Sequence, residues 1–215
     1  MAIARFDNIK LNFSFLEQLL KNHCFHNLIN LSFKNSDISD QGIQTFNYGK
    51  WDKLEEFNLY GNHLTNEGIK TFSTLSFPRL KRLDLSANKD LNNQAIEILK
   101  GENLPTLTFF SLSLIKNITS DVVPHLLKFP HLRSLDFYGD SLGDEGAIAL
   151  ANSTFRDLIT LNIGGNNIGN KGAVALALSK ANLPNLSSLN LKDNLRIQEG
   201  KQAIRNAAHI KDYCF

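Results

Sequence analysis

Residues 54–68 read LEEFNLYGNHLTNEG, and this stretch decides the fold. Apolar residues stand at its first, fourth, sixth and eleventh positions, with Phe57 replacing one leucine, while Asn62 stands ninth and Gly68 fifteenth. The same spacing recurs in residues 28–42, 132–146 and 158–172, with Ser36 and Asp140 at the ninth position of the first two. The stretch is therefore one copy of an internal repeat.

Three further copies, from Leu80, Leu107 and Leu186, carry small departures or one-residue shifts. The seven copies start at Leu28, Leu54, Leu80, Leu107, Leu132, Leu158 and Leu186, so successive starts lie 25–28 residues apart. The largest departure is Ile115, which replaces the ninth-position asparagine of the fourth copy and should reshape the bend there. This regularity predicts a solenoid of about seven coils.

Each copy predicts one strand followed by one helix. Phe57 and Leu59 alternate with Asn58 and Tyr60, which is the period of a strand with one buried face. Residues 173–181, AVALALSKA, have the apolar spacing of a helix. The ninth-position asparagines should satisfy backbone groups at the bend after the strand. Stacked coils give a parallel concave sheet with helices on the convex side.

These motifs resemble the ribonuclease-inhibitor-like subfamily of leucine-rich repeats. The resemblance implies an α/β solenoid, a curved horseshoe arc, that binds partners on its concave sheet and adjoining loops. The units here are slightly shorter and lack the alternation of cysteine and asparagine between repeats. We expect an N-terminal helical cap over residues 1–27, an array of seven units over 28–208 and a C-terminal tail over 209–215.

Composition limits the classes of function. The 215 residues are 42% hydrophobic and 20% charged with a net charge of +2, which is too mild for a nucleic-acid-binding stripe. The N-terminus lacks the features of a secretory signal, and no stretch reaches the ~20 apolar residues of a membrane span. Cys24 and Cys214 stand near opposite ends and should remain reduced. We expect a cytoplasmic monomer without a bound cofactor.

The outward strand positions predict where a partner protein binds. Units two to five combine exposed aromatic and apolar residues with charged ones, a combination favoured at interfaces. The predicted protein-binding residues are Glu56, Asn58, Tyr60, Arg82, Asp84, Phe109, Ser111, Leu114, Asp136 and Tyr138. The Ser, Asn and Asp side chains of the central column could equally form a plain solvated face.

Motifs for chemistry are weak. His23, Cys24 and His26 could ligate a metal, but no further ligand is evident. Residues 164–172, GGNNIGNKG, do not meet the phosphate-loop pattern. No acid, base and nucleophile set converges by spacing, and an open sheet does not exclude water. We expect neither a metal site nor catalysis.

Three functions of the binding surface stay open. Ribonuclease-inhibitor-like repeats inhibit or mask a partner by covering its active cleft. The composition, rich in Phe and Asn and poor in Cys, is also similar to that of the leucine-rich-repeat effectors of intracellular bacterial pathogens. Such effectors are delivered into host cells without a cleavable signal peptide. The partner would then be a host protein or a fellow effector enzyme. Related repeat proteins regulate a small GTPase, for which Arg82 is the candidate contact. A substrate-recruiting adaptor is the third possibility.

Overall fold

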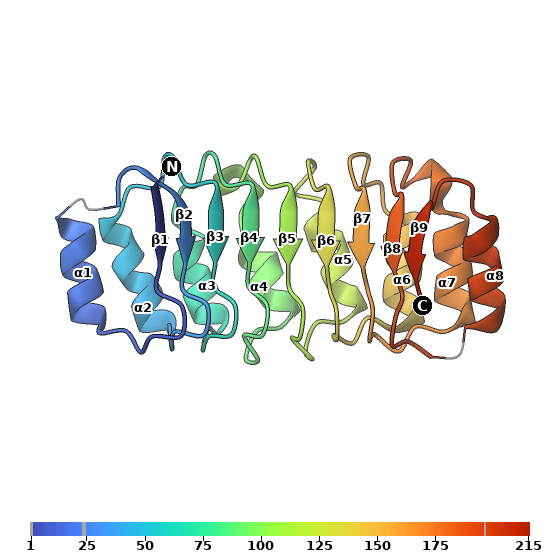
Figure 1. Cartoon of the computed structure of the whole chain (residues 1–215), viewed down its shortest axis with the longest axis horizontal. Helices are drawn as coiled ribbons and strands as arrows, with labels where there is room; N and C mark the ends of the chain where they lie inside the picture. The colour runs from blue at the N-terminus through green and yellow to red at the C-terminus, as the bar shows by residue number, and fades with distance from the viewer. Residues whose placement is uncertain (1, 23–24, 196) are drawn as a thin grey trace.

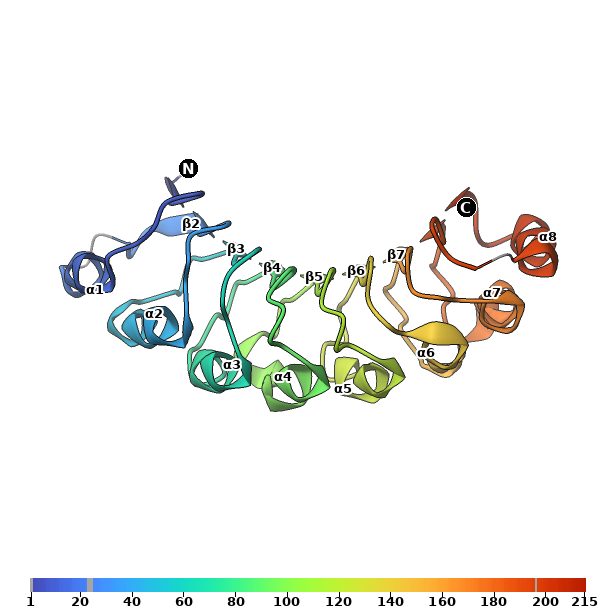
Figure 2. The same ribbon diagram turned by 90° about the horizontal axis from the view of Figure 1, so that it is seen from below.

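A parallel sheet lines one side of the chain and helices line the other. In the computed structural model, which describes residues 2–22, 25–195 and 197–215, the strands stand in chain order and each bonds to the next. Figure 1 shows the row of strands, and Figure 2 shows the arc with the strands inside and the helices outside. Strands lie about 4.8 Å apart and packed helices about 8–10 Å apart, so the array curves toward the sheet.

The described residues form nine strands: β1 (Ala2–Arg5), β2 (Leu28–Ser32), β3 (Glu56–Asn58), β4 (Arg82–Asp84), β5 (Phe109–Ser111), β6 (Ser134–Asp136), β7 (Thr160–Asn162), β8 (Ser188–Asn190) and β9 (Asp212–Cys214). Seven of them are the predicted repeat strands. Their register joins equivalent positions of successive copies, so the columns of the sequence are rows across the sheet.

The helices follow the strands on the convex side: α1 (Phe13–Lys21), α2 (Asp40–Thr45), α3 (Asn66–Phe72), α4 (Asn93–Ile98), α5 (Val123–Leu126), α6 (Gly143–Asn152), α7 (Asn170–Ala177) and α8 (Gln198–Asn206). Short 3₁₀ helices lie at η1 (Phe46–Tyr48), η2 (Gly101–Asn103), η3 (Ser120–Val122) and η4 (Ser179–Ala181). No helix in the described ranges is long and apolar enough to cross a bilayer.

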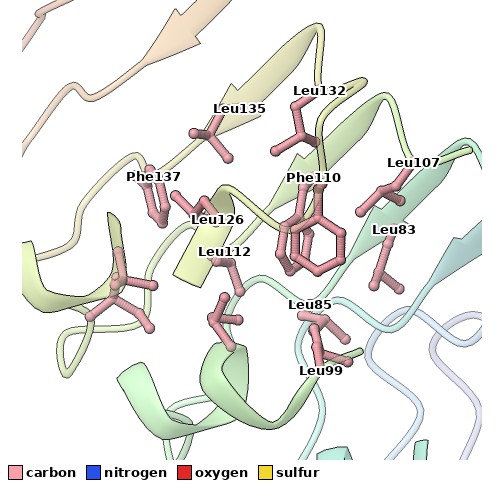
Figure 3. Close-up of a cluster of buried hydrophobic side chains, with 14 of the residues drawn as sticks. Leu83, Leu85, Leu99, Leu107, Phe110, Leu112, Leu126, Leu132, Leu135 and Phe137 are labelled. Carbon is pink, nitrogen blue, oxygen red and sulfur yellow. The ribbon is translucent and has the colours of Figure 1, made fainter. Parts of the chain in front are cut away.

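A continuous apolar core lies between the sheet and the helices. Figure 3 shows part of it, where Phe110 lies among leucines from neighbouring coils. Aromatic rings dominate the core of the first coils, with Phe57 5.9 Å from Phe72 and Phe72 4.8 Å from Phe77 between ring centroids. Each fully buried phenylalanine contributes roughly 1.5–3 kcal/mol. The core thus ties each coil to the next.

Where a ninth-position asparagine is present, it holds the bend after the strand, as the sequence predicts. Nδ2 of Asn62 donates to the carbonyls of Phe33 and Leu59, both at 2.8 Å. Its Oδ1 accepts from the backbone of Ser36 and Ile38 at 3.1 and 2.9 Å. The amide therefore satisfies backbone groups from two coils at once, which fixes their spacing.

The fourth coil carries Ile115 in place of this asparagine, and Asp140 occupies the ninth position of the fifth coil. Ile115 is fully buried, and its backbone nitrogen donates to Oδ1 of Asp140 at 2.6 Å. Oδ2 of Asp140 is buried without a hydrogen-bond partner among the described residues. Burial raises the pKa of Asp140 to about 9, so this carboxyl is protonated at neutral pH. A neutral acid resembles the asparagine that the other coils use.

The sheet extends past the predicted repeats at both ends. β1 pairs with β2 and β9 pairs with β8, each in parallel. The sequence analysis expected helix and tail in these segments. The segment 1–27, expected as a helical cap, does contain α1 (Phe13–Lys21), but neither strand was predicted because neither end carries the repeat pattern. β1 matters for the site, because it adds two side chains to the concave face.

Candidate functional site

A hollow of about 270 Å³ lies on the concave face over the first five strands. We call it the concave hollow. Its lining residues are Arg5, Asp7, Asn30, Ser32, Lys34, Glu56, Phe57, Asn58, Arg82, Asp84 and Phe109. Half of the predicted binding residues lie here: Glu56, Asn58, Arg82, Asp84 and Phe109. The other five stand at the ends of β3 to β6, outside the hollow.

One row of the hollow is a chain of side-chain contacts. Asn30, Glu56, Arg82 and Phe109 are register partners on β2 to β5. Nδ2 of Asn30 donates to Oε2 of Glu56, while Oε1 of Glu56 lies 3.7 Å from Nε of Arg82. The guanidinium carbon of Arg82 lies 3.8 Å from the centroid of the Phe109 ring. Arg82 is thus held between a carboxylate and an aromatic face.

The central row is the column of Ser, Asn and Asp side chains that runs across the sheet from Ser32 to Asn190. Its side chains have a structural role that was not predicted from the sequence. Oδ1 of Asn58 accepts from the backbone nitrogen of Tyr60 at 2.9 Å. Oδ1 of Asp84 and Oδ1 of Asp136 accept in the same way from the residues two positions on, both at 3.0 Å. These side chains close each strand end with an Asx-type turn. The spacing of Asn or Asp two residues before the bend was the available signal.

Serine replaces Asn or Asp in two central-row positions, and a neighbouring coil then supplies the acceptor. The backbone nitrogen of Lys34 donates to Oδ1 of Asp7 at 2.9 Å, and the Ser32 hydroxyl donates to the same oxygen. At Ser111, which is buried, the backbone of Ser113 donates to the Ser86 hydroxyl at 3.1 Å. Ser111 bonds to the hydroxyl of Ser86 at 2.7 Å. Of the ten predicted residues, Ser111 is therefore the least accessible to a partner.

The two predicted tyrosines are both engaged at the edge of the sheet. The Lys34 ammonium lies 4.8 Å from the centroid of the Tyr60 ring. The Tyr138 hydroxyl donates to Oδ2 of Asp193 at 2.8 Å, and this bond raises the pKa of Tyr138. A Cβ on Gly164 would lie 2.9 Å from Cδ2 of Tyr138, so the ring lies against this glycine.

Leu114 combines exposure with backbone strain. Its φ of 62° is in the left-handed region, where the equivalent residues of other coils include Asn35, Gly61 and Gly165. A leucine there costs about 1–2 kcal/mol. Its side chain is 42% exposed. Strain at an exposed apolar residue is typical of a position kept for binding.

Asp84 and two other carboxylates of the concave face lie outside the ion pairs of the described chain. Asp84 is half-buried, and neither it nor Asp7 nor Asp136 forms an ion pair within the described residues. Burial raises the pKa of Asp84, and the nearby charge of Asp136 adds to this effect. Hydrogen bonds from Ser86 and the charge of Lys34 oppose it. Burial is the largest of these effects, so the pKa of Asp84 stays above the ordinary value of an aspartate.

Six lining residues were absent from the predicted set: Asn30, Ser32, Lys34 and Phe57 within the repeats, and Arg5 and Asp7 before them. Arg5 and Asp7 lie outside the periodic region. They follow from β1, whose Arg5 is the register partner of Ser32. Ala2–Arg5 reads AIAR, which does not alternate apolar and polar residues, so no periodic pattern indicated this strand. The expectation of a helical cap concealed it.

The possible metal ligands of the cap do not form a site that can be described. His23 and Cys24 lie outside the described residues. Elsewhere in the described chain, no three His, Cys, Asp or Glu side chains converge as a metal site would need. Cys214 lies exposed in β9.

Comparisons with known proteins agree with the repeat fold. Residues 53–73, 130–151 and 156–177 match a family model described as Leucine Rich repeat. These three segments are similar to leucine-rich repeats, and the fold is that of a leucine-rich-repeat solenoid. No curated protein matches it in sequence.

Solved structures share the leucine-rich-repeat fold at low identity. Internalin C2 from Listeria monocytogenes is 20% identical, with a TM-score of 0.55 over 92% of this chain and 82% of that one. A chain of the Rad7 and Elc1 complex in yeast is 18% identical, with a TM-score of 0.55 over 84% of this chain. Our chain spans 54% of that chain, or about half. At these identities the likeness concerns the fold.

Proposed function

We propose that this leucine-rich-repeat protein is a binding module that engages a partner protein through its concave face and does not itself catalyse a reaction. The observation that carries the proposal is the concave hollow, where Arg82 is held between Glu56 and Phe109. Arginine and aromatic residues in a fixed arrangement are the usual anchors of protein interfaces. The complex of Rad7 with Elc1 includes a chain of this fold, which accords with the proposal.

Within this proposal, masking or inhibition of the partner is our first choice. A concave face with its own anchors can cover a convex partner without any moving part. Delivery as a bacterial effector, and action inside a cell, remain part of the proposal on grounds of sequence style alone.

Regulation of a small GTPase is the second candidate, and the geometry favours it less. A catalytic arginine contact needs a free guanidinium to reach the phosphates. The Arg82 guanidinium is instead near Glu56 and stacked on Phe109. This arrangement suits an interface residue. A substrate-recruiting adaptor would use the same surface in the same way.

The test is an affinity pulldown with two matched variants. The concave variant combines Tyr60→Ala, Arg82→Ala and Phe109→Ala; the control combines Lys171→Ala and Glu199→Ala on the convex helices. Circular dichroism first establishes that both fold as the wild type does. We expect the partner, identified by mass spectrometry, to be lost from the concave variant alone. A partner that the concave variant keeps and the convex variant loses would contradict the proposal.

A further inference from the structure

The connections between strands and helices differ in charge according to the end of the strand that they join. Because the strands are parallel, the connections that enter them share one border of the solenoid, which we call the strand-start edge (Figure 1). These connections hold ten Lys and Arg residues and four Asp and Glu residues. The connections from strand ends to helix starts hold six of each. The strand-start edge is therefore net positive.

Part of this charge is already engaged within the chain. The four acids each have a cationic or imidazole neighbour on this edge: Glu55 lies 2.9 Å from Lys81, Asp157 lies 3.5 Å from His131, and Asp52 and Glu102 stand two positions from Lys50 and Lys100. Nζ of Lys128 donates to three carbonyls at the end of α4, and Nζ of Lys180 donates to the carbonyl of Pro184. Cations at helix C-termini are an ordinary structural feature. These lysines are therefore not evidence of a binding site.

Three arginines of the strand-start edge remain available. Arg79, Arg133 and Arg156 are exposed, and their guanidinium groups form no ion pair with any described residue. They precede β4, β6 and β7. At ~4.8 Å per strand they extend over roughly 14 Å, which an extended peptide of about four or five residues covers. Arginine binds a carboxylate through two parallel hydrogen bonds, so this spacing suits acidic side chains along one segment.

Two hollows with exposed apolar side chains flank these arginines. Arg156 lines a hollow of about 180 Å³ with Leu127, Phe129, Pro130, Thr154 and Phe155. Arg133 lines an open depression of about 400 Å³ with Asp157, Ile159, Asn185 and Ser187. Leu127 is 46% exposed and Ile159 is 42% exposed. The rings of Phe129 and Phe155 are buried, so these hollows lack the exposed aromatic faces on which nucleic-acid bases stack. Apolar side chains of a protein suit them better.

We infer that the strand-start edge over β4 to β7 binds an acidic segment of a partner protein. Its carboxylates pair with Arg79, Arg133 and Arg156, and its apolar side chains enter the two hollows beside them. The excess of cations over acids on this edge selects an acidic occupant. The surface goes beyond the proposed function, because none of the three arginines lines the concave hollow.

Two variants that lose the same charge test the inference. The edge variant combines Arg79→Gln, Arg133→Gln and Arg156→Gln. The matched control combines Lys89→Gln, Lys116→Gln and Lys192→Gln, which are exposed lysines on connections that leave the strands. All six side chains are exposed, so both variants should fold, which circular dichroism checks.

The probe is a fluorescein-labelled peptide of glutamates interrupted by leucines, titrated with the whole chain and followed by fluorescence anisotropy. We expect saturable binding that weakens with added salt. The dissociation constant should rise about tenfold or more in the edge variant and stay constant in the matched control. It should also stay constant in the concave variant of the pulldown. The same peptide with glutamine in place of glutamate should not bind.

Several outcomes would overturn the inference. Absence of saturable binding would do so, as would an equal loss in the matched control, which would show an effect of net charge alone. Loss of binding in the concave variant would place the peptide in the concave hollow instead. Tighter binding of oligothymidylate than of the peptide would favour a nucleic acid. None of these results decides the pulldown, so the proposed function and this inference can fail separately.

Discussion

The Tyr138 hydroxyl donates a hydrogen bond to Oδ2 of Asp193 at 2.8 Å, although 55 positions separate the two residues. Tyr138 follows β6 and Asp193 follows β8, so the phenol crosses the end of β7. Gly164, which follows β7, offers no side chain to block it. The lack of a side chain at Gly164 thus lets two coils of the solenoid make contact.

The acidity of Tyr138 should depend on Asp193. The carboxylate accepts the phenol hydrogen bond and repels a phenolate, and both effects raise the pKa of Tyr138. We expect Asp193→Asn to lower this pKa toward the ordinary value of tyrosine. An NMR titration with ¹³C-labelled tyrosine measures it, with Asp157→Asn as the control for a general change of charge. An unchanged pKa in Asp193→Asn would show that the bond does not persist in solution.

A methyl group at position 164 should destabilise the fold. The Cβ of Gly164→Ala would lie 2.9 Å from Cδ2 of Tyr138 and 2.9 Å from the backbone oxygen of Lys192. Because the second neighbour is backbone, we expect the free energy of unfolding in urea to fall by about 1–3 kcal/mol. Adding Tyr138→Ala should restore part of the loss. Stability equal to the wild type would mean that the strand ends can separate at little cost.

Asp140 should make stability depend on pH. Burial raises its pKa to about 9, whereas an unfolded aspartate has a pKa near 3.9. Between these values the folded state keeps a proton on Asp140 that the unfolded state has lost. The contribution of Asp140 to stability is therefore complete below about pH 4 and is lost as the pH rises to about 9. We expect Asp140→Asn to keep the bend and to gain on the order of 1–3 kcal/mol over the wild type near pH 9.

Thermal unfolding from pH 5 to about pH 9 checks this expectation. Asn166→Asp is the converse variant, since Asn166 is fully buried and its Nδ2 donates to the carbonyl of Phe137 at 2.7 Å. We expect Asn166→Asp to lose further stability at alkaline pH, in addition to the loss caused by Asp140. Parallel pH profiles for the wild type and Asp140→Asn would refute a neutral Asp140.

Leu114→Asn should stabilise the fold and weaken partner binding. Asn35 adopts the same left-handed conformation at the equivalent position, with a φ of 51°. Relief of the strain at Leu114 should raise the free energy of unfolding by about 1 kcal/mol. Urea denaturation and the pulldown measure the two effects together. A destabilised variant would mean that contacts of Leu114 outweigh its strain.

The repeat predicted most of the fold because its signals are local. Alternation along each strand, the ninth-position asparagine and the regular spacing fix which face of each coil is buried and which residues become neighbours across the sheet. The row from Asn30 to Phe109 was therefore readable before the structure. The strands β1 and β9 were not, because each lies outside the periodic region and is defined by pairing with a neighbouring coil.

By itself, the sequence determined the solenoid, its concave rows and seven of its strands, since one periodic pattern specifies burial coil after coil. Only the tertiary structure decided how the concave side chains are used. The Arg82 stack on Phe109, the reach of Tyr138 to Asp193 and the neutral carboxyl of Asp140 depend on side-chain conformation and on burial by neighbouring coils. They rest on contacts between residues 25 or more positions apart, and no local pattern encodes them.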